Sequence, residues 1–68
     1  MTGDTIDTLI RMANQIATNL GHEDDPAAAA AEHIRLYWDP RMKSAITAYR
    51  GDGLGPVATE AVRQIAGA

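Results

Sequence analysis

Residues 33–42 read HIRLYWDPRM and decide how this chain folds. They hold its one Trp, one of its two Tyr and an Asp-Pro pair between two helical patterns. The residue before a proline avoids the helical backbone region, so Asp39 is expected to break the axis while Pro40 starts a new helix. A short chain that concentrates aromatic and cationic side chains at such a junction is typical of a protein that binds another protein.

Hydrophobic spacing on both sides of this junction predicts an all-α fold, a small bundle of four short helices. The expected helices cover about 5–20, 26–38, 40–50 and 56–66. Asp25-Pro26 repeats the arrangement of Asp39-Pro40, with an Asp cap and a proline at the first helical position. Residues 1–68 are therefore expected to form a single helical domain.

The second expected helix carries most of the aromatic side chains. Its predicted inner stripe consists of Ala27, Ala30, Ala31, Ile34, Tyr37 and Trp38. The alanines at the front of this stripe would let another backbone approach closely. Leu36 projects roughly opposite the stripe, so we expect an isolated domain to expose it.

The composition sets narrow limits on stability and location. A chain of 68 residues buries only about 60% of its unfolded surface, so its hydrophobic core is marginal. Cysteine is absent, which excludes disulfides and thiolate metal sites and fits a reducing compartment. The sequence has no signal-like N-terminus and no apolar run of about 18 residues, so we expect a cytoplasmic protein with no membrane partner.

The net charge of −3 is unevenly distributed. Residues 1–32 carry six acids and one Arg, whereas residues 33–68 carry three acids and five basic side chains. An excess of two positive charges is too small for a nucleic-acid-binding surface. Such an excess is enough to orient a protein partner.

The candidate motifs for metal binding, phosphate binding and catalysis lack the residues or the spacing that each function requires. The acidic run at 22–25 lacks the alternation and central Gly of a calcium loop, and His22 and His33 lack a third ligand. The Gly-rich segment 51–55 lacks the Lys and Ser or Thr of a phosphate loop. Ser44 has no pattern of His and acid around it. We therefore expect no catalytic, cofactor-binding or metal-binding residue, and no enzyme activity from this chain alone.

Three residues of the junction leave two interpretations open. Arg41 lies in the first turn of a helix, where a positive charge is disfavoured by about 0.3–1 kcal/mol. Pairing with Asp39 or Glu32 would offset this cost within the chain, and an acidic pocket in a partner would do so outside it. Trp38 suits either the core or an interface. His33 suits either a partly buried hydrogen bond or a partner contact.

Two segments together resemble the delta subunit of NAD-dependent formate dehydrogenases. They are RMANQI at 11–16 and HIRLYWDPRM at 33–42, followed by GLGP at 53–56 before a short Ala-rich helix. The resemblance covers nearly the whole chain. The motif falls on Met12, Ala13, Asn14, Gln15, Ile16, His33, Ile34, Trp38, Pro40, Arg41 and Met42. A short acidic loop at 21–26 and a short tail after Ile65 depart from the family pattern.

The resemblance implies a non-catalytic accessory subunit with no prosthetic group of its own. In that family the alpha subunit carries a molybdenum or tungsten pterin and iron–sulfur clusters, while other subunits carry flavin and bind NAD. The delta subunit supports assembly or stability of the active complex, so the expected partner is the alpha subunit. The expected partner interface comprises His33, Leu36, Tyr37, Trp38, Arg41 and Met42, with Asn14 and Gln15.

Two other roles remain open at this point. A helical module could bury its surplus apolar surface in a homodimer and have no enzyme partner. Alternatively, the chain could be a transient chaperone that binds the alpha subunit only while the molybdenum cofactor is inserted. The sequence does not separate these roles from that of a permanent subunit.

Overall fold

The computed structural model describes residues 4–49 and 51–67, with side chains from residue 6 onward. It contains helices α1 (Asp4–Asn19), α2 (Pro26–Tyr37), α3 (Pro40–Ala48) and α4 (Pro56–Gly67), and the described ranges contain no strand. The predicted all-α bundle of four short helices is confirmed. Helix α3 ends earlier than expected because Tyr49 has extended backbone angles, and residue 50 lies outside the described ranges.

Both Asp-Pro pairs act as predicted. The Asp25 carboxylate accepts a hydrogen bond from the backbone N–H of Ala28 at 3.2 Å, which caps α2. The Asp39 carboxylate accepts one from the N–H of Met42 at 2.8 Å, which caps α3. Two residues thus separate the end of α2 from the start of α3, and the chain changes direction there without a long loop.

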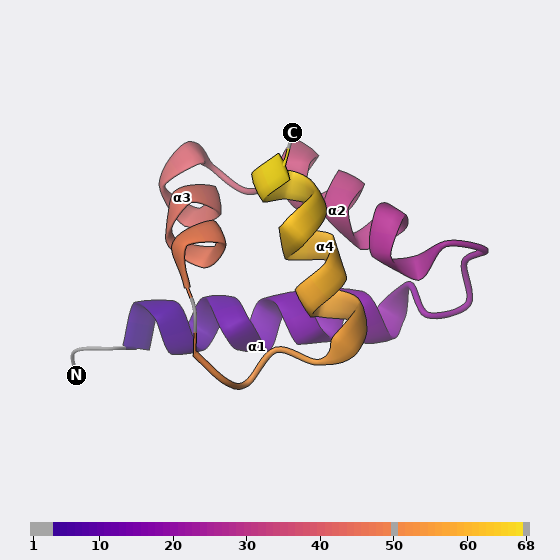
Figure 1. Ribbon diagram of the computed structural model, residues 1–68, viewed down its shortest axis with the longest axis horizontal. Coiled ribbons are helices and arrows are strands. Elements are labelled where there is room, and N and C mark those ends of the chain that lie inside the picture. The colour runs from indigo at the N-terminus through magenta and orange to yellow at the C-terminus, as the bar shows by residue number, and fades with distance from the viewer. Residues whose placement is uncertain (1–3, 50, 68) are drawn as a thin grey trace.

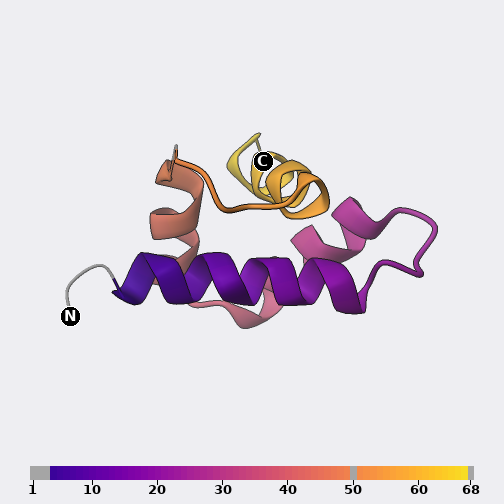
Figure 2. The same cartoon turned by 90° about the horizontal axis from the view of Figure 1, so that it is seen from below.

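Helix α1 forms one side of the molecule, and the other three helices pack on it (Figures 1 and 2). In Figure 1, α3 stands over the N-terminal half of α1, α2 lies toward its C-terminal end, and α4 runs between them. The loop after α3 passes alongside α1 before α4 begins, as Figure 2 shows from below. Helices α2 and α3 both contact α1, so the short junction between them lies against α1.

Small side chains let α2 and α4 pack closely. Ala30, Ala31 and Ala61 are almost fully buried and contact one another, which confirms the role predicted for the alanine stripe. Ile34 and Ile46 are the largest fully buried side chains. The main cluster of the core is formed by Leu9, Ala13, Ile34, Trp38, Ile46, Ala58 and Val62.

Asn14 fixes the loop between α3 and α4. Its side-chain amide donates to the Gly53 carbonyl oxygen at 2.7 Å, and its amide oxygen accepts from the Gly55 N–H at 2.8 Å. These two bonds span the peptide groups around Leu54, whose side chain packs against the core. Gly53 has a φ of +113°, a conformation that L side chains rarely adopt.

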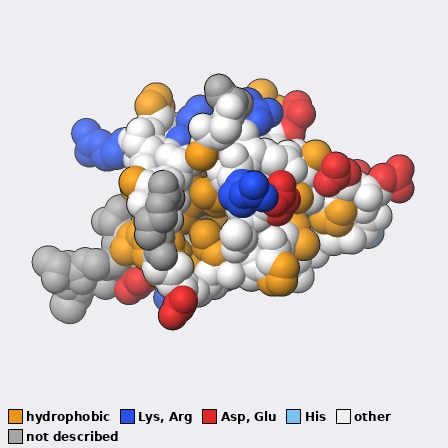
Figure 3. Space-filling model, in the orientation of Figure 1, with side chains coloured by type: hydrophobic (Ala, Val, Ile, Leu, Met, Phe, Trp, Pro, Cys, Tyr) orange, Lys and Arg blue, Asp and Glu red, His pale blue; other side chains and the backbone are white. Residues whose placement is uncertain are grey.

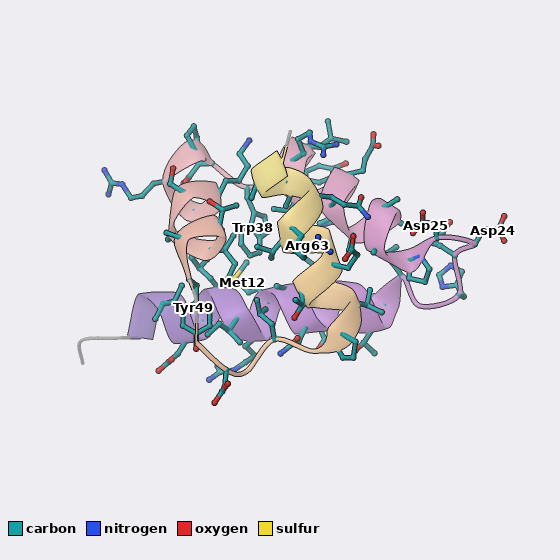
Figure 4. The ribbon with its side chains drawn as sticks, in the orientation of Figure 1. Met12, Asp24, Asp25, Trp38, Tyr49 and Arg63 are labelled. Atoms are coloured by element: carbon teal, nitrogen blue, oxygen red, sulfur yellow. The ribbon has the colours of Figure 1, made fainter. Side chains whose placement is uncertain are left out.

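The charged side chains are unevenly distributed over the face seen in Figure 3. Lys and Arg side chains lie over α3 and the end of α2, Asp and Glu side chains lie over the loop between α1 and α2, and Arg63 pairs with Glu60 on α4. Figure 4 places Asp24 and Asp25 in that acidic loop, at the far end from α3. Within residues 4–49 and 51–67, no helix combines the length and apolarity required to cross a membrane.

Candidate partner-binding groove

An apolar groove of about 360 Å³ lies where α1 meets the α2–α3 junction. Its walls come from three elements that are distant in the sequence. The lining residues are Met12, Gln15, Ile16, His33, Tyr37, Trp38 and Met42. Five of the eight residues predicted to contact a partner therefore surround one depression.

Helical spacing explains why these residues meet. Gln15 and Ile16 follow Met12 by three and four residues, so each lies beside Met12 on one side of α1. On α2, His33 and Tyr37 are four residues apart, and their rings are in contact with centroids 4.8 Å apart. The cap of α3 by Asp39 brings Met42 back toward the same place.

Trp38 forms the floor of the groove and Tyr37 its wall. Trp38 is only 5% exposed and belongs to the main core cluster, whereas Tyr37 is 73% exposed. The prediction that Tyr37 faces the core is wrong. Relative to Ile34, Trp38 lies about 40° round the helix axis and Tyr37 about 60° in the other direction, so packing Trp38 inward turns Tyr37 outward.

Figure 4 shows how the two labelled lining residues lie. Met12 projects from α1 and Trp38 comes from the end of α2, and they lie near one another between these elements. Met12 is 36% exposed and is not part of the core clusters, so it is available at the surface of the groove. Met42 is half-buried and packs against the core. The two sulfur-containing side chains thus give the groove adaptable walls.

Leu36 and Arg41 are exposed and do not belong to the groove lining. Leu36 is 65% exposed, which confirms that the fold leaves it uncovered. Arg41 forms no ion pair with any residue in the described ranges, so the pairing with Asp39 or Glu32 considered above does not occur. Of the two interpretations of Arg41, compensation within the chain is wrong. The first-turn cation remains uncompensated in this structure.

Asn14 and Gln15 are neighbours in the sequence but lie on different sides of α1. Gln15 lines the groove, and its side chain donates to Asn19 at 3.2 Å. Asn14 contacts the loop at 53–55 on the other side, and both ends of its amide are engaged there. The structural role of Asn14 was missed from the sequence. The one available signal was an amide side chain beside the apolar stripe together with a Gly-rich loop far along the chain.

A larger hollow of about 540 Å³ lies on that other side of α1. It is lined by Asn14, Ala17, Thr18 and residues 53–58. This lining has no charged or aromatic side chain, and Asn14 already holds the adjoining loop. In the described ranges, no group of three or more His, Cys, Asp and Glu side chains is placed to hold a metal ion. The groove at α1 and the α2–α3 junction is therefore the better candidate site.

The groove residues lie within a segment that matches a known family. The model of the NADH-dependent formate dehydrogenase delta subunit FdsD matches residues 8–62. The chain belongs to the FdsD family. The resemblance inferred from segments 11–16 and 33–42 is thereby confirmed. No curated protein and no solved structure matches the chain significantly.

Proposed function

We propose that this FdsD-family chain is a non-catalytic accessory subunit of a cytoplasmic NAD-dependent formate dehydrogenase. In this proposal it binds the molybdenum-containing alpha subunit and supports assembly or stability of the active complex. Prosthetic groups and catalysis belong to the other subunits. The observation that carries the proposal is the family match over residues 8–62, which includes every residue of the groove.

The exposed apolar surface beside the groove supports a binding role. Leu36 and Tyr37 are the most exposed large hydrophobic residues of the described ranges, and Met12 lies in the groove beside Tyr37. Large apolar side chains that gather on one surface mark interaction sites in soluble proteins. A partner that covers this surface would also stabilise the folded chain, because binding to the folded state alone shifts the folding equilibrium.

Co-expression with the formate dehydrogenase subunits of the same cell tests this proposal. We expect the tagged chain to co-purify with the alpha subunit, and its omission to lower the recovery of formate-dependent NAD reduction. The double variant Leu36→Ser/Tyr37→Ser should lower co-purification, because it removes two exposed apolar side chains. The control Arg63→Ala removes one large exposed side chain from α4 and should leave recovery unchanged. Recovery that does not depend on the chain at all would contradict the proposal.

Mass measurement of the purified active complex separates a permanent subunit from a transient chaperone. We expect the chain to be present in the mature complex. A mature complex that lacks the chain, yet fails to form without it, would indicate a chaperone. The isolated chain should neither oxidise formate nor retain metal, and turnover by the purified chain would overturn the non-catalytic assignment.

A further inference from the structure

The chain contains one Asp-Gly pair, Asp52 and Gly53, in the loop between α3 and α4. An aspartyl residue converts to isoaspartate when the nitrogen of the next residue attacks its side-chain carboxyl carbon. Glycine hinders this attack least, because it has no Cβ beside the nitrogen. Asp25 and Asp39 precede prolines, which carry no N–H and cannot react in this way. Asp52 is therefore the aspartyl residue whose sequence context most favours the reaction.

Both reacting groups of this pair are accessible. Asp52 and Gly53 are exposed and lie in neither a helix nor a strand. In the part of the chain that the structure describes, no hydrogen bond or ion pair holds the Asp52 carboxylate, and the Gly53 N–H donates to no acceptor. The attack of this nitrogen on the carboxyl group therefore breaks no existing hydrogen bond.

The same pair lies between two anchors of the loop. The Tyr49 hydroxyl donates to the main-chain carbonyl oxygen of Asp52, and the Asn14 amide donates to the carbonyl oxygen of Gly53 at 2.7 Å. Asn14 also accepts from the N–H of Gly55 at 2.8 Å. Two consecutive carbonyl groups are thus held by side chains from different parts of the chain. The length of main chain between these carbonyl groups must match both anchors.

We propose that Asp52 is a site of spontaneous isoaspartate formation, and that the modification releases the loop from Asn14. The Gly53 nitrogen forms a bond to Cγ of Asp52, and a carboxyl oxygen leaves as water with the amide proton and one proton from solvent. Water then adds to the main-chain carbonyl carbon of Asp52, the bond from this carbon to the Gly53 nitrogen breaks, and one proton returns to solvent. Water and protons balance over the two steps, and neither an oxidant nor a reductant takes part.

The product no longer matches the two anchors. Its main chain passes through Cβ and Cγ of residue 52, which adds one carbon–carbon bond of about 1.5 Å. The oxygen that accepts from Tyr49 becomes part of a free carboxylate instead of a peptide group. The Gly53 carbonyl is displaced from Asn14, so the bonds from Asn14 weaken. Leu54, which packs against the core between these bonds, loses its fixed position.

Storage of the folded full chain at neutral pH and physiological temperature tests the site. Trypsin releases peptides 51–63 and 12–35, in which chromatography and electron-transfer fragmentation distinguish isoaspartate from aspartate. Isoaspartate should form roughly tenfold faster at Asp52 than at Asp24, which is also exposed in a loop but precedes Asp25 instead of a glycine. Equally slow conversion at both positions would overturn the proposal.

The variant Asp52→Glu is the matched control for the chemistry. It keeps the negative charge in the same exposed position, but the corresponding attack would have to close a six-membered ring instead of a five-membered one. Position 52 of this variant should stay unmodified over the storage time in which the unmodified chain converts. Conversion of the Glu variant at the same rate would contradict the proposed ring closure.

Two further variants test whether the loop itself controls the rate. Asn14→Ala frees the Gly53 carbonyl and the Gly55 N–H, so local opening should accelerate isoaspartate formation several-fold. Ile34→Val weakens the core from α2, outside the loop, and should leave the rate within about twofold of the unmodified chain. Equal acceleration in both variants would show that the reaction proceeds through global unfolding and not through the loop.

The isolated isoaspartyl chain tests the structural consequence. Its Gly55 amide should exchange hydrogen faster than in the unmodified chain, and its thermal unfolding should occur at a lower temperature. Asp52→Glu stored for the same time should keep both values. An isoaspartyl chain with unchanged exchange at Gly55 would overturn the release of the loop from Asn14.

Discussion

The two sides of α1 use neighbouring residues of one motif in opposite ways. On one side, Asn14 makes two hydrogen bonds to a distant loop and completes the fold. On the other side, Met12 and Gln15 meet the α2–α3 junction and leave a groove open to solvent. A short motif thus serves the interior and the surface at once. Whether a residue of α1 contacts the loop or lines the groove depends on the rotation of about 100° per residue along the helix.

The closed side and the open side also differ in what a substitution should change. On the closed side, each replacement should lower the free energy of unfolding. On the open side, replacements of exposed residues should change the free energy of unfolding by no more than about 1 kcal/mol and should act mainly on partner binding. Substitutions on the two sides of α1 test this division.

Trp38 belongs to the core and also lines the groove. Trp38→Ala should have the largest effect on the free energy of unfolding. Its side chain is 5% exposed and packs with Ile34 and Ile46 in the main core cluster. Truncation of a buried Trp costs about 3–5 kcal/mol. For a chain of this size that is a large part of the total stability, so urea unfolding should show a largely unfolded variant. The neighbouring Tyr37→Ala should unfold within about 0.5 kcal/mol of the unmodified chain.

Asn14→Ala should destabilise the fold by about 1–3 kcal/mol, because the part-buried N–H of Gly55 loses its acceptor. Gln15→Ala, the matched change on the open side, should stay within about 0.5 kcal/mol. Urea unfolding measures the free energy of unfolding of both variants. Hydrogen exchange of the Gly55 amide should accelerate only in Asn14→Ala. Equal effects of the two changes would contradict the division between the two sides of α1.

Gly53→Ala should cost about 1–2 kcal/mol in thermal or urea unfolding. The φ of +113° is unfavourable for an L residue, and an added Cβ would lie 3.2 Å from Cγ2 of Ile10. Gly67→Ala is the control, since a Cβ there meets nothing within 4 Å. A neutral result at position 53 would mean that the loop adopts another conformation than the one Asn14 holds.

Arg41→Glu should change the free energy of unfolding least and should raise it, whereas the substitutions above lower it. An acid in the first turn of α3 interacts favourably with the helix dipole, so stability should rise by about 0.3–1 kcal/mol. Binding to the alpha subunit should weaken in the same variant. A rise in stability with loss of binding would show that Arg41 is retained for contact outside the chain. A loss of stability would instead indicate a compensating contact within it.

Local sequence signals predicted the helices well. In each Asp-Pro pair the Asp caps the helix and the Pro is its first residue, so α2 and α3 begin at the expected prolines. The alanine stripe predicted the close approach of another backbone to α2, because its spacing is a property of one helix, and the structure shows that this backbone is α4. The end of α3 was less predictable, since Tyr49 leaves the helix although its spacing continues the apolar pattern.

The candidate site was only partly predictable. Helical spacing does not decide whether Tyr37 or Trp38 occupies the core, because both lie within about 60° of Ile34 round the helix axis. Only the packing of α2 against the other helices selects Trp38. The bonds from Asn14 join residues 39 and 41 positions apart, so no local pattern shows them. The convergence of Met12, Gln15, His33 and Met42 likewise depends on how α1 and α2 pack. Sequence reasoning named most of the groove residues but not the groove.

Hydroxyl-radical footprinting of the chain within the intact formate dehydrogenase tests whether a partner covers the groove. Met12 and Tyr37 lie at the groove, and Tyr49 lies elsewhere on the surface, in the hollow beside residues 51–54. All three are reactive side chain types that are at least partly exposed in the isolated chain. We predict that Met12 and Tyr37 lose reactivity in the complex while Tyr49 keeps it. Unchanged reactivity of Met12 and Tyr37, with protection of Tyr49, would show that the partner binds elsewhere than the groove.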